Sequence, residues 1–142
     1  AMLPFCGYNM ADYWQHWIDI GAGLDEDKAP KIFNVNWFRK DDDGNFLWPG
    51  FGDNLRVLEW ILKRCFDEVD AQETPIGYEP NPTDINLEGT DVSLETLTGL
   101  LGVDKDLWME DVTNIEEFYK DFGDKLPPAL REELETLKKN LQ

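Results

Sequence analysis

The sequence predicts a mostly helical α+β fold with one small β-hairpin or sheet element. Several stretches carry apolar residues at helical spacing, begin with a capping residue and end near glycine. One short stretch, residues 32–48, is instead aromatic and β-branched and has a turn signal in its middle. Hydrophobic residues make up 42% of the 142 residues, which is enough for the chain to fold around a core.

The first helix is expected to follow Asn9, whose side chain can cap it, and to end at Gly21 and Gly23. A charged loop over residues 24–30 comes next. The apolar positions at helical spacing are Met10, Tyr13, Trp14, Trp17 and Ile18.

Residues 32–38 are expected to form a strand, and residues 46–48 its return strand. Asp43-Gly44 is the turn signal between them. The Pro49–Gly52 stretch cannot continue a central strand, because proline lacks an N–H donor and glycine allows unusual torsions.

A second helix is expected after Asp53 or Asn54, either of which can cap it. Its predicted apolar stripe is Leu55, Leu58, Ile61, Leu62 and Cys65. Residues 67–92 are acidic and contain three prolines, so we expect a loop there, with a short strand near residues 76–78.

Three helices are expected in the remainder of the chain. Ser93 caps the first and Gly102 ends it, Asp104 opens the second, and Pro127-Pro128 begins the last. The predicted core-facing positions are Leu94, Leu97, Leu100, Leu101, Trp108, Val112, Ile115, Tyr119, Phe122, Leu130, Leu134, Leu137 and Leu141.

The net charge of −17 argues against binding of duplex nucleic acid or of an anionic membrane, both of which need a basic face. A nucleotide is also a polyanion, so its cations would have to come from a metal ion or from chain outside this sequence. With no signal peptide, no membrane-spanning run and only two cysteines, Cys6 and Cys65, we expect a cytoplasmic protein with reduced thiols.

The segment from Asn36 to Asn54 is the best candidate for a binding site. Its aromatic residues lie at strand ends and in a Gly/Pro loop, where a purine ring could stack for about 1–3 kcal/mol per contact. The carboxamide of Asn54 can offer both a donor and an acceptor to a base edge. Two alternatives stay open at this point: the aromatic residues could be cross-strand packing, and Asn54 could be a helix cap.

Other candidate sites are weaker. His16 is the only histidine, so it is expected at the surface or an interface rather than in a metal cluster. The Asp41–Asn45 run lacks the ligand spacing of a calcium loop and is expected to be a solvated turn. The sequence has no phosphate-binding glycine loop with a following lysine, and we predict no catalytic and no metal-binding residue in it.

The sequence resembles the C-terminal segment of GTP-dependent phosphoenolpyruvate carboxykinases. The Trp48-Pro49-Gly50-Phe51-Gly52 run is the most specific part of this resemblance, and Asn34 departs from it because the family usually has histidine there. The matching stretches are Met2–Asn9, Tyr13–Trp17, Lys31–Arg39, Phe46–Asn54, Thr74–Gly77 and Phe122–Pro127.

The resemblance implies that the chain is part of an enzyme of gluconeogenesis. That enzyme would use manganese and magnesium to convert oxaloacetate and GTP to phosphoenolpyruvate, GDP and carbon dioxide. It implies that Phe38 and Phe51 sandwich the guanine, that Phe46 lines the pocket, that Trp37 adjoins it and that Asn54 reads the guanine edge. The chain would then be a fragment of the larger α/β nucleotide-binding domain of that family.

The family's phosphate loop, metal ligands and reactive cysteine precede this segment, so Cys6, Cys65 and His16 do not stand for them. The fragment alone is therefore expected to be inactive. Its expected partners are guanine nucleotide and the upstream part of the same enzyme, and the docking surface for that part could drive self-association. A stand-alone acidic binding or scaffold domain is the alternative, whereas a complete small kinase is disfavoured by the missing phosphate loop.

We expect the organisation to be residues 1–66 as helix, guanine-binding hairpin and helix, residues 67–92 as loop, and residues 93–142 as C-terminal helices. The opening residues are already apolar, which favours a chain that continues an upstream part.

Overall fold

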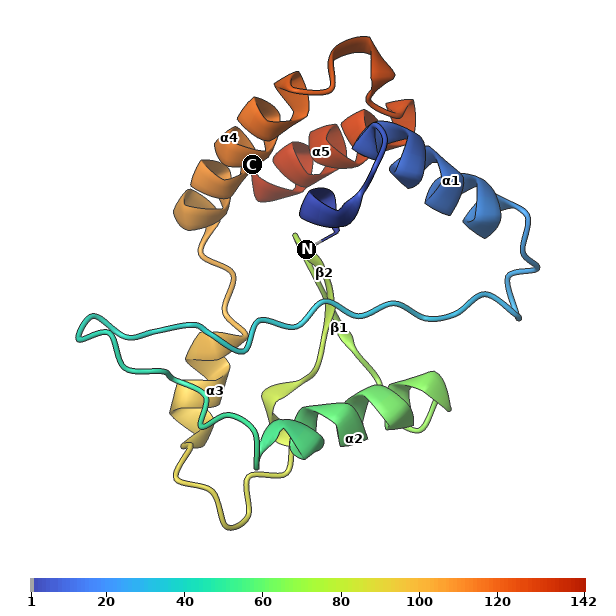
Figure 1. The fold of residues 1–142 in the computed structure, drawn as a ribbon. Coiled ribbons are helices and arrows are strands. Elements are labelled where there is room, and N and C mark those ends of the chain that lie inside the picture. The colour runs from blue at the N-terminus through green and yellow to red at the C-terminus, as the bar shows by residue number, and fades with distance from the viewer. Residues whose placement is uncertain (1) are drawn as a thin grey trace. The chain divides into compact units, whose positions relative to one another are not determined.

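The computed structural model describes residues 2–142, most of whose regular structure is helical (Figure 1). The helices are α1 (Met10–Ala22), α2 (Asn54–Cys65), α3 (Leu94–Leu100), α4 (Lys105–Lys120) and α5 (Pro128–Leu141). A two-stranded antiparallel sheet pairs β1 (Gln72–Thr74) with β2 (Gly77–Glu79), and short 3-10 turns lie at Leu3–Phe5, Pro82–Asp84 and Gly123–Lys125. The predicted fold class, mostly helical α+β, is confirmed. Within the described residues, no helix is both long enough and apolar enough to cross a membrane.

The chain divides into two compact units. The first unit comprises the chain up to Pro30 together with Asp104–Gln142, and the second comprises Lys31–Val103. The first unit is thus built from both ends of the sequence. The second unit is one continuous segment, and it contains every residue predicted to contact a ligand.

In the first unit, α4 packs against α5, and α1 adds an aromatic contact to α4. The ring centroid of Trp14 lies 6.0 Å from that of Phe118 and 4.7 Å from that of Phe122. Trp17 was predicted on the same apolar face but is half exposed. The buried residues of this unit are Met10, Ala11, Val112, Leu126, Pro127, Leu134 and Leu141.

Three helices begin at the capping residues that the sequence predicts. The Oδ1 atom of Asn9 accepts a hydrogen bond from the backbone N–H of Ala11, with 2.9 Å between the two atoms. Ser93 Oγ accepts from the third helical residue of α3 at 3.0 Å, and Asp104 Oδ1 accepts from two N–H groups of α4. These side chains satisfy N–H groups that have no partner within the helix.

The core of the second unit is formed by Trp48, Trp60, Ile85 and Leu97. Partly buried apolar residues surround these four, among them Phe33 and Trp37. The paired strands β1 and β2 join through a turn at which Gly77 has φ of 122°. The sequence predicts only the second of these strands, because β1 consists of the polar residues Gln-Glu-Thr and carries no strand signal of its own.

The second predicted helix is present as α2, but its predicted apolar stripe is correct only in part. Three of the five predicted positions are largely exposed, namely Leu55, Leu58 and Leu62. The core receives Trp60, which the predicted stripe omits, and Val57 and the predicted Ile61 pack against the same cluster. A tryptophan buries more apolar area than a leucine, so the helix is most stable with the face that carries Trp60 turned inward.

The strand predicted at residues 32–38 is absent, and the pairing with residues 46–48 is reduced to one antiparallel bridge between Lys40 and Phe46. Asn36 supplies a physical reason. Its Oδ1 atom accepts a hydrogen bond from the backbone N–H of Phe38 at 2.9 Å. Such a local bond offers the backbone an alternative to pairing in a sheet.

Candidate functional site

The extended segment over residues 31–39 is held at both ends by cations bound to helix C-termini. Lys31 Nζ lies 3.2 Å from the carbonyl oxygens of the last two residues of α2. The guanidinium of Arg39 donates to the carbonyl oxygens of the last two residues of α3, at 3.2 and 2.9 Å. The unpaired carbonyls at a helix C-terminus favour a positive charge, so these contacts position the segment without a strand partner.

Between these two anchors, the side chains of the segment divide between core and solvent. The ring of Phe33 packs edge-on against Trp60, with centroids 6.2 Å apart, and Trp37 is packed against the same core cluster. Phe38, the next residue, is 72% exposed. Successive side chains of an extended chain point in opposite directions, so the packing of Trp37 against the core places Phe38 at the surface.

The turn that follows is organised by Asp41. Its carboxylate accepts hydrogen bonds from the backbone N–H of Asp43 at 3.0 Å, and from the backbone N–H and the side chain of Asn45 at 2.8 and 3.2 Å. The bond from the Asn45 backbone is the largest cause that lowers the pKa of the Asp41 carboxyl below its ordinary value. Gly44 has φ of 84°, as the predicted turn requires, and the expectation of a solvated turn is confirmed by the exposure of these residues.

We expect Asp41→Ala to loosen the hairpin and to remove the contact between the rings of Phe38 and Phe46. The matched control is Asp42→Ala, which removes the adjacent exposed carboxylate. Because folding lowers the pKa of Asp41 from 3.8, its contribution is complete above that value and is lost as the pH falls through the lower folded pKa. NMR cross-peaks between the two rings provide the measurement, and equal loss in both variants would contradict this role for Asp41.

The hairpin places Phe38 beside Phe46. Their ring centroids are 6.1 Å apart and the planes meet at 62°, an edge-to-face contact. Phe46 is 57% exposed, and Lys40 Nζ lies 5.0 Å from the centroid of its ring. The two rings therefore present aromatic surface to solvent, with one cation beside them.

Phe51 lies on the turn that leads into α2 and is 96% exposed. The carbonyl oxygen of Gly50 accepts hydrogen bonds from the backbone N–H groups of Asp53 and Asn54, at 3.0 and 3.1 Å. Gly50 has φ of 98°, a conformation that residues with a Cβ rarely adopt. The glycine thus makes a tight turn that leaves the phenyl ring of Phe51 in solvent.

Asn54 does not cap α2, contrary to one of the two sequence interpretations. It is the first residue of the helix, and its Oδ1 atom accepts a hydrogen bond from Trp48 Nε1 at 2.9 Å. Asp53 occupies the cap position, but its carboxylate binds Arg56 Nε at 2.7 Å rather than a backbone N–H. The sequence carries no signal for this bond, because the meeting of Trp48 and Asn54 depends on how the chain packs.

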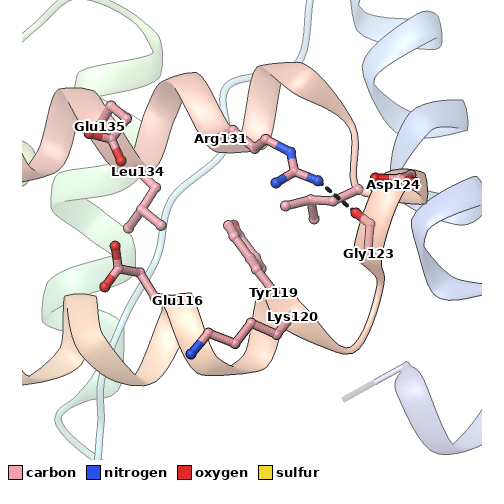
Figure 2. A pocket seen from close by; sticks show the side chains of 9 residues that line it. Glu116, Tyr119, Lys120, Gly123, Asp124, Arg131, Leu134 and Glu135 are labelled. Carbon is pink, nitrogen blue, oxygen red and sulfur yellow. Dashed lines mark hydrogen bonds between the residues drawn. The ribbon is translucent and has the colours of Figure 1, made fainter.

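A separate pocket of about 590 Å³ lies in the first unit (Figure 2). It is open, and Arg131 donates a hydrogen bond to the carbonyl oxygen of Gly123 at 2.6 Å within it. Burial raises the pKa of the Tyr119 phenol above its ordinary value. None of the five residues predicted to bind guanine lines this pocket.

No group of three or more His, Cys, Asp or Glu side chains within residues 2–142 is arranged to hold a metal ion. His16 is exposed on α1, as predicted. Cys6 and Cys65 are both free.

Comparison with known proteins gives a consistent result along the whole chain. A family model described as phosphoenolpyruvate carboxykinase C-terminal P-loop domain matches residues 1–140. A Chlamydia caviae protein named phosphoenolpyruvate carboxykinase (GTP) is 50% identical over 143 residues, which cover 100% of this chain and 24% of that protein. Proteins of the same name from Treponema pallidum subsp. pallidum and Renibacterium salmoninarum are 52% and 48% identical, covering 96% and 99% of this chain. The chain spans about a quarter of the length of these relatives.

Proposed function

Because the chain belongs to the family of GTP-dependent phosphoenolpyruvate carboxykinases, we propose that it supplies the guanine-binding pocket of such an enzyme. The parent protein would convert oxaloacetate and GTP to phosphoenolpyruvate, GDP and carbon dioxide. This chain would contribute base recognition, whereas the phosphate loop, the metal ligands and the reactive cysteine would lie in the upstream part.

The observation that carries this proposal is the exposure of three phenylalanines of the second unit, two on the hairpin and one on the turn before α2. Phe38, Phe46 and Phe51 are 72%, 57% and 96% exposed, while Trp48 between them in sequence is buried. Exposed aromatic rings on turns suit a flat apolar ligand, because covering them removes apolar surface from water.

In the proposed complex, the rings of Phe38 and Phe51 stack on opposite faces of the guanine. Phe46 lines the pocket from beside Phe38, with which it already makes an edge-to-face contact. Trp37 supports the pocket from the core. Base stacking on aromatic rings contributes about 1–3 kcal/mol per base and does not distinguish one purine from another. Discrimination between purines therefore requires a polar group, and the carboxamide of Asn54 is the candidate.

The charge of the chain supports a model in which this chain binds the base and the upstream part binds the phosphates. The net charge of −17 opposes binding of the triphosphate, so phosphate recognition would belong to the upstream part and its metals. The base, in contrast, is uncharged and can be held by stacking and hydrogen bonds alone.

Replacement of Phe51 by alanine tests the proposal. We expect the unmodified chain to respond to GDP and not to ADP when its tryptophan fluorescence is titrated. Phe51→Ala should weaken GDP binding by about 5- to 150-fold, the equivalent of one lost stack. Because Phe51 is 96% exposed, its loss should change the free energy of unfolding by less than about 0.5 kcal/mol.

The matched control is Phe66→Ala, which removes another exposed phenylalanine of the same unit, 73% exposed, at the end of α2. The control should bind GDP like the unmodified chain. Equal loss of binding in both variants, or equal responses to GDP and ADP, would contradict a guanine pocket at Phe51.

A further inference from the structure

A hydrogen bond links the core of the second unit to the residue proposed to read the base. Trp48 Nε1 donates to Asn54 Oδ1 over 2.9 Å. Trp48 is 6% exposed and belongs to the core cluster, whereas Asn54 is only partly buried at the start of α2. The buried end of this contact is therefore fixed by packing, and the other end is accessible to a ligand.

The chemistry of the indole decides which way the carboxamide faces. A carboxamide has an oxygen that accepts and an NH₂ group that donates, and either end can occupy a site of the same shape. The indole N–H is a donor only. The oxygen of Asn54 must therefore face Trp48, and this leaves the NH₂ group to donate elsewhere.

We propose that Trp48 is a positioning residue that sets the base selectivity of the site by holding the Asn54 carboxamide in this orientation. The inference rests on the proposed function, in which Asn54 reads the base. An NH₂ group held outward matches the carbonyl oxygen at position 6 of guanine. The second lone pair of Oδ1 remains able to accept from the N1–H of guanine.

Adenine presents the opposite pattern on the same edge, an amino group at position 6 and an acceptor at N1. Reading it would require the carboxamide to turn over, so that its NH₂ group faced the indole N–H. Two donors would then meet in the core and the buried indole would lose its partner. The loss of a hydrogen bond to a buried donor corresponds to a penalty of about 10- to 100-fold in affinity for adenine.

Trp60 provides a matched comparison within the same core cluster. It is 4% exposed, and its Nε1 atom has no hydrogen-bond partner among the described residues. Trp48→Phe and Trp60→Phe thus remove similar volumes from one core, but only the first removes a hydrogen bond to Asn54. A difference between the two variants reports the hydrogen bond rather than the packing.

The test is the affinity of this chain for GDP, IDP and ADP, measured by calorimetry in the unmodified protein and in the two variants. IDP carries the 6-oxo group and N1–H of guanine but lacks the 2-amino group, so it isolates the edge that Asn54 reads. We expect the unmodified chain and Trp60→Phe to prefer GDP and IDP over ADP. Trp48→Phe should lower the ratio of GDP affinity to ADP affinity, and that of IDP affinity to ADP affinity, by about 10-fold or more. Unchanged ratios in Trp48→Phe would overturn the proposal.

A second measurement does not depend on nucleotide. In the free chain, the indole proton of Trp48 should exchange more slowly with solvent than that of Trp60, and Asn54→Leu should shift the Trp48 resonance and leave that of Trp60 in place. A Trp48 resonance that does not respond to Asn54→Leu would overturn the positioning role alone. Failure of the unmodified chain to prefer GDP over ADP would instead count against the proposed function, and against the selectivity role with it.

Discussion

Replacing Val112 with aspartate is expected to unfold the first unit of the chain. Val112 lies on α4, which packs against α5, and is 1% exposed. A carboxylate at that position would lose its hydration without gaining a partner, which costs about 4 kcal/mol or more. A typical domain has only about 5–15 kcal/mol of stability, so this single change removes much of it.

Thermal unfolding followed by circular dichroism provides the measurement for Val112→Asp. The matched control is Asn114→Asp, which adds the same charge at an exposed position on the same helix and should unfold like the unmodified chain. Burial would raise the pKa of the introduced carboxyl, so the defect should lessen under acidic conditions, where the carboxyl is protonated. Equal stability of the two variants would show that Val112 is not part of a packed core.

The largest effect on ligand binding is expected for Asn54→Asp. The substitution keeps an oxygen that can accept from Trp48 but removes both N–H donors of the carboxamide. It also brings a negative charge to the position proposed to face the carbonyl oxygen of guanine. Two acceptors, the carboxylate and the guanine carbonyl, would then face each other without a hydrogen bond. We therefore expect GDP affinity to fall by about 100-fold or more.

The same substitution should not weaken the fold. Asn54 is the first residue of α2, where the helix dipole favours a negative charge by about 0.3–1 kcal/mol. For Asn54→Asp, calorimetric titration should therefore show a lower affinity for GDP, whereas thermal unfolding should show a slightly higher melting temperature.

The control for Asn54→Asp is Asn86→Asp, another asparagine of the second unit. The side chain of Asn86 accepts a hydrogen bond from the backbone N–H of Glu88 at 2.8 Å, so the aspartate can keep that bond while adding the same charge. The control should bind GDP normally. Retention of GDP binding by Asn54→Asp would exclude Asn54 as the residue that reads the base.

The helices could be predicted because their signals are local. Each helix cap is a side-chain oxygen that accepts a hydrogen bond from a backbone N–H two or three residues further on, as at Asn9, Ser93 and Asp104. A short stretch of sequence therefore contains both partners. The turn at Gly44 was predictable for the same reason, since its bonds to Asp41 span only a few residues. The family was recognisable from the Trp48–Gly52 run, which is too specific to arise by chance.

Other features depend on residues far apart in the sequence. The buried face of α2 follows from the position of Trp60 in a core that also contains Ile85 and Leu97. The segment over residues 31–39 is held by carbonyl oxygens at the ends of α2 and α3, and not by a neighbouring strand. No periodicity within a short window could indicate either arrangement, because the partners are set by the packing of the whole unit.

The candidate site illustrates both sides of this division. The sequence by itself determined the family and the helices with their caps, because both depend on residue types at short spacing. The resemblance to that family, in turn, implies which aromatic residues carry the guanine-binding prediction. Only the tertiary structure decided which of these rings stay exposed and which way the carboxamide of Asn54 faces. Exposure depends on what covers a side chain, and the direction of the carboxamide depends on a donor-only indole that the core holds in place.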